Sequence, residues 1–290
     1  MTIFKKGISM IPNKIYVDEL IKRALLEDIN YIDLATDLLI DEDSQTQAEY
    51  IAKADGVVCG IDIACRVFEL LDDEIRTDVY IHDGERVRKG DVIGVISGRT
   101  RTVLKGERTS LNILQHMSGI ATAAAEFAAA CKGTKATVAD TRKTLPGLRV
   151  LEKYAVTVGG GRNHRFNLSD AAMIKDNHID AYGGIIPAVK ALRSKIGHMN
   201  MIEVEVRSKD ELDQAIEAGA DVIMLDNMSV EEMAECVKIT DGRAKLEASG
   251  GITLETIRDI AQTGVDIISS GALTHSAKAF DISLKIKKNR

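Results

Sequence analysis

Several charged and glycine-rich segments of this 290-residue sequence could form a site for anionic ligands. The segment 159–178 combines three consecutive glycines with Arg162, His164, Arg165 and Lys175. A guanidinium group can bind a carboxylate through two parallel hydrogen bonds, whereas a lysine acts as a point charge. The whole chain is acidic, with a formal net charge of −6, so this basic segment calls for a specific explanation.

The positive charge is confined to one part of the chain. Residues 132–178 contain nine Lys or Arg against four Asp or Glu, a net charge of +5, which leaves −11 for the remainder. A basic region on an acidic protein is typical of a pocket for a small anion, because a nucleic-acid-binding face needs a broad positive surface. The sequence has no Trp, so it also supplies few platforms on which bases could stack.

The cations are more numerous than a single phosphate requires. This number indicates two anionic ligands, a carboxylated acceptor and a phosphorylated donor with its metal. His164 could donate to a carboxylate or could support its neighbours, and the sequence leaves both roles open. The remaining candidate cations are Arg108, Arg142, Lys143, Arg165 and Lys175.

Two acidic residues, Glu205 and Asp226, lie at the ends of neighbouring apolar segments. Carboxylates in such positions suit Mg²⁺, which takes oxygen ligands from the protein and from a polyphosphate. The two-residue period of a strand places Glu203 on the same side as Glu205. We expect Glu205 to be the metal ligand because it lies nearer to the end of its strand, while Glu203 also fits a buried ion pair.

Two glycine-containing turns occur late in the chain, at 249–251 (Ser-Gly-Gly) and at 270–272 (Ser-Gly-Ala). Glycine lets a ligand approach the backbone closely, and the N–H groups of such turns bind anions. Either turn alone would fit a simple tight turn, but the pair at the last two units is typical of a phosphate site in a barrel. His275, just behind the second turn, is a further candidate for a phosphate contact.

The elements that must position these residues alternate between strands and helices. Capping signals, such as Ser208 with Glu211, Ser229 with Glu232, and Thr253, precede helix-like segments. This alternation predicts parallel β/α units, and seven strand candidates favour a partial seven-stranded (β/α) barrel over an open doubly wound sheet. The strand candidates are 135–140, 154–158, 171–175, 201–206, 218–225, 244–249 and 263–270.

The first part of the chain has a different pattern. Residues 20–29 look helical, whereas 48–61, 78–100 and 101–107 alternate between apolar and polar residues, which predicts antiparallel strands. A long helical segment, 107–131, joins the two regions. We therefore expect an α/β protein with an N-terminal α+β sandwich domain (1–113), against which residues 277–290 could pack, and a catalytic barrel domain (114–276).

Composition bounds the setting of the protein. The four cysteines are scattered in apolar surroundings, which favours buried, reduced thiols: Cys59, Cys65, Cys131 and Cys236. No run of eighteen apolar residues appears, and the N-terminal segment does not fit a signal peptide, so we expect a cytoplasmic protein.

The motifs, taken in order, resemble those of the quinolinate phosphoribosyltransferase family. The resemblance covers nearly the whole chain and is carried by "ERTSLNILQHMSGIAT", "ADTRKTLPGLRVLEKYAV", "GGGRNHRFNLSDAAMIKDNHI", "EVEV", "LDN", "EASGGI" and "SGALTHS". It implies an N-terminal sandwich and a partial seven-stranded barrel. It also implies transfer of phosphoribosyl from phosphoribosyl pyrophosphate to quinolinate with loss of CO₂, giving nicotinate mononucleotide for NAD synthesis. Arg162 is one departure, because many members have His there.

The resemblance also implies roles for individual residues. Lys143, Glu205 and Asp226 would be catalytic, and the two acids would hold Mg²⁺. Arg108 would enter the site from the neighbouring subunit of a homodimer. Quinolinate would be bound by Arg108, Thr141, Arg142, His164, Arg165 and Lys175. Phosphoribosyl pyrophosphate would be bound by Lys143, Lys175, Glu205, Asp226, Ser249, Gly250, Gly251, Ser270, Gly271, Ala272 and His275.

Four alternatives are less well supported. A related family linked to molybdate uptake lacks the lysine that is present here as Lys175. A transferase that uses nicotinate would have one carboxylate to bind and would need fewer arginines. A Schiff-base aldolase could use Lys143 or Lys175, but the flanking arginines argue against it. A biotinyl-type carrier is suggested by 83–94, yet Lys89 lies in a turn pattern that is common to many β domains.

Overall fold

The structure is a computed structural model that describes residues 12–287, so parts of the predicted N-terminal domain (1–11) and of its C-terminal addition (288–290) lie outside the described residues. The chain forms two compact units. The first comprises Met1–Ala125, Leu145–Gly159 and Ala277–Arg290, and the second comprises Glu126–Thr144 and Gly160–Ser276. The division after Ala125 falls within a long helix, as does the predicted boundary at residue 113.

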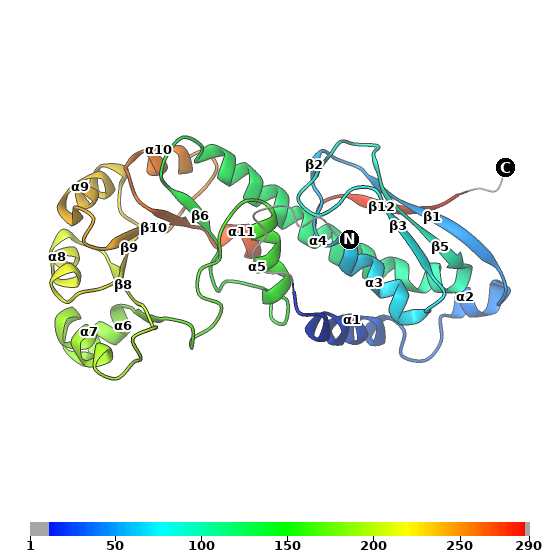
Figure 1. The fold of residues 1–290 in the computed structure, drawn as a ribbon, viewed down its shortest axis with the longest axis horizontal. Coiled ribbons are helices and arrows are strands. Elements are labelled where there is room, and N and C mark those ends of the chain that lie inside the picture. The colour runs from blue at the N-terminus through cyan, green and yellow to red at the C-terminus, as the bar shows by residue number, and fades with distance from the viewer. Residues whose placement is uncertain (1–11, 288–290) are drawn as a thin grey trace. The chain divides into compact units, whose positions relative to one another are not determined.

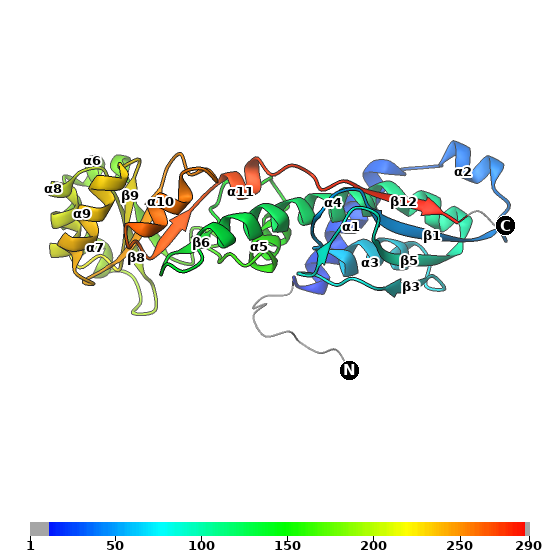
Figure 2. The ribbon, with the colours of Figure 1, turned by 90° about the horizontal axis from the view of Figure 1, so that it is seen from above.

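The first unit is built on an antiparallel sheet in the order β12-β1-β5-β3. Strand β12 pairs with β1 along its whole length, and the two run side by side in Figure 2. Tyr50, Phe68 and Leu114 are fully buried and belong to one hydrophobic core, so helices α3 (Ile61–Leu71) and α4 (Thr100–Ala130) pack on this sheet. The strands are β1 (Gln45–Ala52), β3 (Arg76–Val79), β5 (Val92–Arg99) and β12 (Ile282–Ile286), with a separate pair, β2 (Gly56–Val57) and β4 (Arg86–Val87).

The helices of the first unit differ in part from the prediction. The segment 101–107, predicted as a strand, is the start of α4, because its alternating residues continue directly into the long helical segment. Helix α3 was not predicted, although Ile61, Cys65 and Phe68 repeat at helical spacing. The helices are α1 (Lys14–Asp28), α2 (Leu34–Leu39), α3 (Ile61–Leu71), α4 (Thr100–Ala130) and α5 (Arg149–Val158).

The second unit contains a six-stranded parallel sheet in the order β6-β11-β10-β9-β8-β7. Helices lie along the outer face of this sheet, as α7, α8, α9 and α10 do in Figure 1. The predicted α/β class is therefore confirmed. The strands are β6 (Thr137–Ala139), β7 (Ala172–Ile174), β8 (Ile202–Val206), β9 (Val222–Asp226), β10 (Lys245–Ser249) and β11 (Ile267–Ser269).

The sheet has six strands where seven were predicted, because 154–158 belongs to helix α5. Val156 and Val158 favour a strand locally. However, Leu151 and Ala155 are buried one helical turn apart, so packing of one face of the helix decides the conformation. On the other side of β6, Arg162 forms an isolated parallel bridge with Ala139. A single residue therefore continues the sheet beyond β6.

The helix caps explain where the βα units turn. Ser229 and Glu232 form the predicted capping box, whereas Ser208 caps α8 alone and Glu211 accepts from the N–H of Arg207 instead. Thr253 does not cap a helix, because a turn at 253–256 precedes α10. The helices are α6 (Asp176–Tyr182), α7 (Ile185–Arg193), α8 (Lys209–Glu217), α9 (Val230–Thr240), α10 (Ile257–Gln262) and α11 (Ala272–His275).

All four cysteines are free and buried, as predicted. Within residues 12–287, none of the helices has both the length and the apolar character needed to span a membrane.

Candidate active site

A cavity of about 640 Å³ opens at the carboxyl ends of the parallel strands of the second unit. Every residue predicted for the site except Arg108 lines it. These residues are Thr141, Arg142, Lys143, His164, Arg165, Lys175, Glu205, Asp226, Ser249, Gly250, Gly251, Ser270, Gly271, Ala272 and His275. The residues come from the carboxyl ends of all six strands and from the segment after Arg162, so the parallel topology collects them from distant parts of the sequence.

One wall of the cavity is basic. Burial lowers the pKa of Arg165, and the like charge of Arg142 lowers it further. Arg165 is held by a hydrogen bond from its Nη1 to the carbonyl oxygen of Ala171, at 2.9 Å. Two guanidinium groups that disfavour each other's charge, with Lys175 on the same wall, would gain most from a ligand that carries more than one negative charge.

The cavity also has an acidic side, next to the basic one. Lys175 Nζ lies 3.2 Å from Glu205 Oε2, so the two sides meet at this pair. Arg207 joins the two acids, with its Nη2 3.2 Å from Glu205 and its Nε 3.3 Å from Asp226. One exposed arginine thus holds two carboxylates close together, and it also contacts Asp176. Their oxygen atoms match the hard ligands that Mg²⁺ prefers, so the donor set fits a magnesium ion.

Arg207 was not predicted from the sequence. It is not among the residues that line the cavity, but its position directly after strand β8 places it beside Glu205 and Asp226. Six residues that do line the cavity were also not predicted, although Met224 and Glu247 lie two positions before predicted site residues on their strands and so share their face. The others are Met173, Ile252, Thr253 and Ser269.

The two glycine turns form the remaining edge of the cavity. Gly250 and Gly251 both have positive φ angles, 97° and 59°. A Cβ atom on Gly250 would lie only 2.1 Å from Asn227 Oδ1, so no side chain fits between the two loops. At the second turn, a Cβ on Gly271 would lie 2.8 Å from Cδ of Lys143. Gly250 is therefore required for close packing, whereas a side chain at Gly271 would displace the side chain of Lys143, and both turns contribute backbone to the cavity.

The short helix after the second turn also fixes the loop that carries Lys143. Thr274 Oγ1 donates to the carbonyl oxygen of Lys143 at 2.8 Å, and the N–H of Lys143 donates to Thr141 Oγ1 at 3.0 Å. The loop after β6 is thereby tied to helix α11 (Ala272–His275), which follows the neighbouring strand β11.

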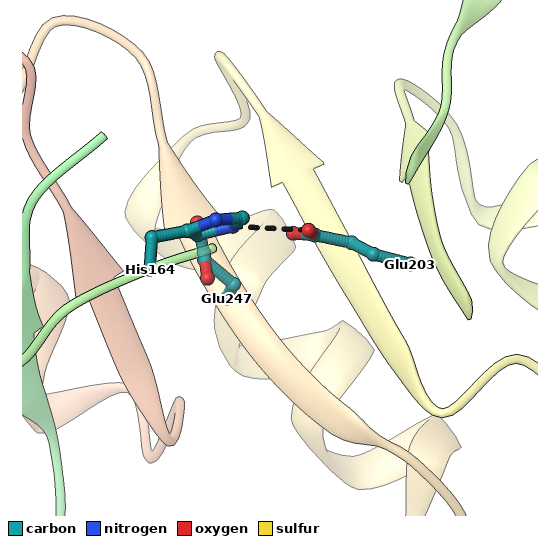
Figure 3. Close-up of side chains that lie close together, drawn as sticks. All are labelled: His164, Glu203 and Glu247. Atoms are coloured by element: carbon teal, nitrogen blue, oxygen red, sulfur yellow. Dashed lines mark ion pairs between the residues drawn. The ribbon is translucent and has the colours of Figure 1, made fainter. Parts of the chain in front are cut away.

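His164 lies at the base of the cavity beside two buried glutamates. Its Nε2 atom is 3.0 Å from Glu203 Oε2 and 3.6 Å from Glu247 Oε1. Figure 3 shows the imidazole and Glu203 pointing toward each other, with Glu247 next to the ring. Burial and the neighbouring Glu203 raise the pKa of Glu247 to about 7. The predicted inward orientation of both Glu203 and Glu205 is thus observed, and Glu203 is paired with a histidine rather than with a Lys or Arg.

Arg108 belongs to the first unit and does not line this cavity. It borders a separate cavity of about 240 Å³, together with Asn112 and His116. His116 Nε2 lies 2.9 Å from the fully buried Glu152. Arg108 thus takes no part in the cavity of the second unit within the single chain.

Comparison with known proteins agrees with this geometry. Residues 33–118 match the model for "Quinolinate phosphoribosyl transferase, N-terminal domain", and residues 120–285 match the model for the "C-terminal domain" of the same family. The chain belongs to the quinolinate phosphoribosyl transferase family. The family resemblance inferred from the motifs is therefore confirmed.

Individual members of the family are similar over nearly their full length. The chain is 45% identical to a "Probable nicotinate-nucleotide pyrophosphorylase [carboxylating]" of Bacillus subtilis, over 94% of each chain. It is 42% identical to "Quinolinate phosphoribosyltransferase [decarboxylating] 2b, mitochondrial" of Nicotiana tabacum, over 92% of this chain and 81% of that one. A crystal structure of NadC from Streptococcus pyogenes superposes with a TM-score of 0.93 at 42% identity, over 96% of this chain and 99% of that one.

Proposed function

We propose that this protein transfers the phosphoribosyl group of phosphoribosyl pyrophosphate to quinolinate and releases pyrophosphate and CO₂, giving nicotinate mononucleotide for NAD synthesis. The carrying observation is that two arginines and a lysine line the same cavity as an acidic pair, Glu205 and Asp226. Family membership supports the same reaction, since the named relatives are nicotinate-nucleotide pyrophosphorylases and quinolinate phosphoribosyltransferases. The expected cytoplasmic location belongs to this proposal.

Quinolinate would occupy the basic wall. Its two carboxylates need at least two cationic partners, and the paired guanidinium groups of Arg142 and Arg165 supply planar donors for them. Lys175 adds a point charge, and Thr141 adds a hydroxyl at the same edge. An acceptor with a single carboxylate would leave one arginine with a like-charged neighbour and no anion, so nicotinate is the less suitable substrate.

Phosphoribosyl pyrophosphate would lie across the acids and the glycine turns. Exposed backbone at Gly250, Gly251, Gly271 and Ala272 would receive the 5′-phosphate, with Ser249, Ser270 and His275 beside it. The side chain of Lys143 passes close to Gly271, and its ammonium group would contact the pyrophosphate. Glu205 and Asp226 would hold Mg²⁺, which would supply positive charge to the leaving pyrophosphate when bound.

The charges then account for the reaction. The pyridine nitrogen forms a bond to C1 of the ribose as the bond from C1 to pyrophosphate breaks. Positive charge develops on the ribose during this step, and Glu205 and Asp226 can stabilise it electrostatically. The quaternised ring then accepts the electron pair of the breaking carbon–carboxylate bond, so CO₂ leaves and a proton takes its place. Holding both anions in one cavity supplies much of the acceleration.

A second subunit would complete the site. Arg108 lies outside the cavity of its own second unit, and the resemblance to the family implies that it enters from the neighbouring subunit of a homodimer. This arrangement would add a third guanidinium to a substrate that carries two carboxylates.

Product analysis by mass spectrometry tests the proposal. The full chain is incubated with phosphoribosyl pyrophosphate and Mg²⁺, and with either quinolinate or nicotinate. We expect nicotinate mononucleotide from quinolinate, together with one equivalent of CO₂. Product from nicotinate alone would overturn the assignment of the acceptor, and no product from either acid would overturn the proposed activity.

A further inference from the structure

The hydrogen-bond pattern around His164 fixes which ring nitrogen carries the proton. The backbone N–H of Arg165 donates to His164 Nδ1 at 2.8 Å, so Nδ1 is an acceptor and carries no hydrogen. A neutral imidazole then has its hydrogen on Nε2, which lies 3.0 Å from Glu203 Oε2 and can donate to it. In this arrangement both ring nitrogens are engaged by the protein itself.

The same pattern argues against a metal ion at this cluster. His164, Glu203 and Glu247 place one donor atom each within 4.8 Å of the others, as a metal site would. However, coordination through Nε2 would require the hydrogen to move to Nδ1, where it would face the N–H of Arg165. The cluster is therefore better suited to hold a proton than a cation.

The backbone of His164 is also held in place, by the carboxylate of Asp140. Asp140, which is fully buried, accepts the N–H of His164 at 2.9 Å and the side chain of Asn163 at 2.5 Å. Glu203 and Glu247 come from strands β8 and β10, so the ring is anchored to the sheet while Nδ1 holds the backbone of Arg165 (Figure 3). The consequence is a chain of contacts from the rigid sheet to an arginine of the basic wall.

We propose that His164 is a positioning residue, which transmits the placement of Glu203 to Arg165 through its two ring nitrogens, and not a ligand of the substrate carboxylate. This inference rests on the proposed function for its kinetic test. Rigid support of this kind matters because a displacement of about 1 Å at a reacting group can cost on the order of 100-fold in rate. Glu247 completes the support by packing beside the ring.

The tautomer can be measured without any activity. The full chain is labelled with ¹⁵N-histidine, and the signals of His164 are assigned by their loss in His164→Gln. We expect ring-nitrogen shifts and couplings of the Nε2–H tautomer, unchanged when quinolinate is added. A hydrogen on Nδ1, or a doubly protonated ring in the presence of quinolinate, would overturn the proposal. If the wild type turned over no quinolinate, the proposed function would fail while this measurement would still decide the role of the ring.

A double-mutant cycle provides the kinetic test. Glu203→Leu and His164→Leu should each lower kcat/KM for quinolinate by about 10- to 100-fold, mainly by raising the KM for quinolinate, and the double variant should be no worse than either one. Glu203→Gln keeps an oxygen that accepts from Nε2 and should restore most of the loss. Melting temperatures show whether each variant is folded. Multiplicative losses, or a Glu203→Leu variant with wild-type KM, would show that His164 acts independently of Glu203.

Discussion

At the scale of single residues, the paired arginines carry the choice of substrate. Replacing Arg142 with Ala removes one planar donor from the basic wall and relieves the like charge on Arg165. We expect kcat/KM for quinolinate to fall by roughly 10- to 100-fold, as a charged hydrogen bond contributes about 1.5–3 kcal/mol. The KM for phosphoribosyl pyrophosphate should change little. Arg193→Ala is the matched control, because Arg193 pairs with Asp221 away from the cavity.

A second residue-scale prediction concerns the proton on Glu247. Burial and Glu203 raise its pKa from 4.5 to about 7 in the folded chain, with His164 opposing this shift and Asp140 adding to it. At pH values below the ordinary pKa, Glu247 is protonated in both the folded and the unfolded chain, so it does not lower the free energy of unfolding. Between the ordinary pKa and the raised pKa of the folded chain, Glu247 ionises in the unfolded chain but stays protonated in the folded chain. The free energy of unfolding therefore falls as pH rises through this range.

The Glu247→Gln variant separates this effect from packing. Gln cannot ionise, so the variant avoids a penalty on the order of 3 kcal/mol that the wild type carries above the folded pKa. The melting temperature of the variant relative to wild type should therefore rise between about pH 5 and pH 7.5 and then level off. A difference that stays constant with pH would show that Glu247 is ionised in the fold at all these values.

At the scale of elements, the glycine turn after β10 is a packing requirement as much as a ligand contact. Gly250 has a φ of +97°, and a Cβ there would meet Asn227 Oδ1 at 2.1 Å. Gly242 also has a positive φ, +74°, but has nothing within 4 Å of an added Cβ. Gly242→Ala should therefore cost about 1 kcal/mol from backbone strain alone.

Gly250→Ala should cost clearly more and should also raise the KM for phosphoribosyl pyrophosphate, since the loop must shift to accept the methyl group. Urea unfolding of the two variants measures the difference, and steady-state kinetics measure the KM. Equal destabilisation of both variants, with KM unchanged, would show that the loop yields without affecting the cavity.

The same elements show how far a sequence determines such a site. Lys143, Glu205 and Asp226 were found because each follows a short apolar segment, and parallel strands end at a common edge. Residues 154–158 were misassigned, because β-branched side chains favour a strand locally while burial of Leu151 and Ala155 favours the helix. The role of Arg207 depends on three acids from separate segments, which no local pattern records.

At the scale of the whole molecule, pairing between distant segments could be suspected from the sequence but its register could not. Residues 277–290 were expected near the N-terminal domain, and the structure pairs Ile282 with Ala52 and Ile286 with Ala48. Such contacts depend on the edge of β1 that does not pair with β5, which is a property of the assembled sheet. The position of Arg108 relative to an active site is a question of the same kind, because its answer depends on a second chain.

Subunit complementation decides that question. As homodimers, Arg108→Ala and Arg142→Ala should each show kcat/KM for quinolinate lowered by roughly 10- to 100-fold, because every site lacks one guanidinium. Co-expression of differently tagged chains gives mixed dimers, in which the chain with Arg108→Ala keeps its own Arg142 and receives Arg108 from its partner. Random pairing should then restore about a quarter of the wild-type activity, since one in four sites is complete. If purified mixed dimers stayed as impaired as the homodimers, Arg108 would act within its own subunit, and the two-chain site would have to be abandoned.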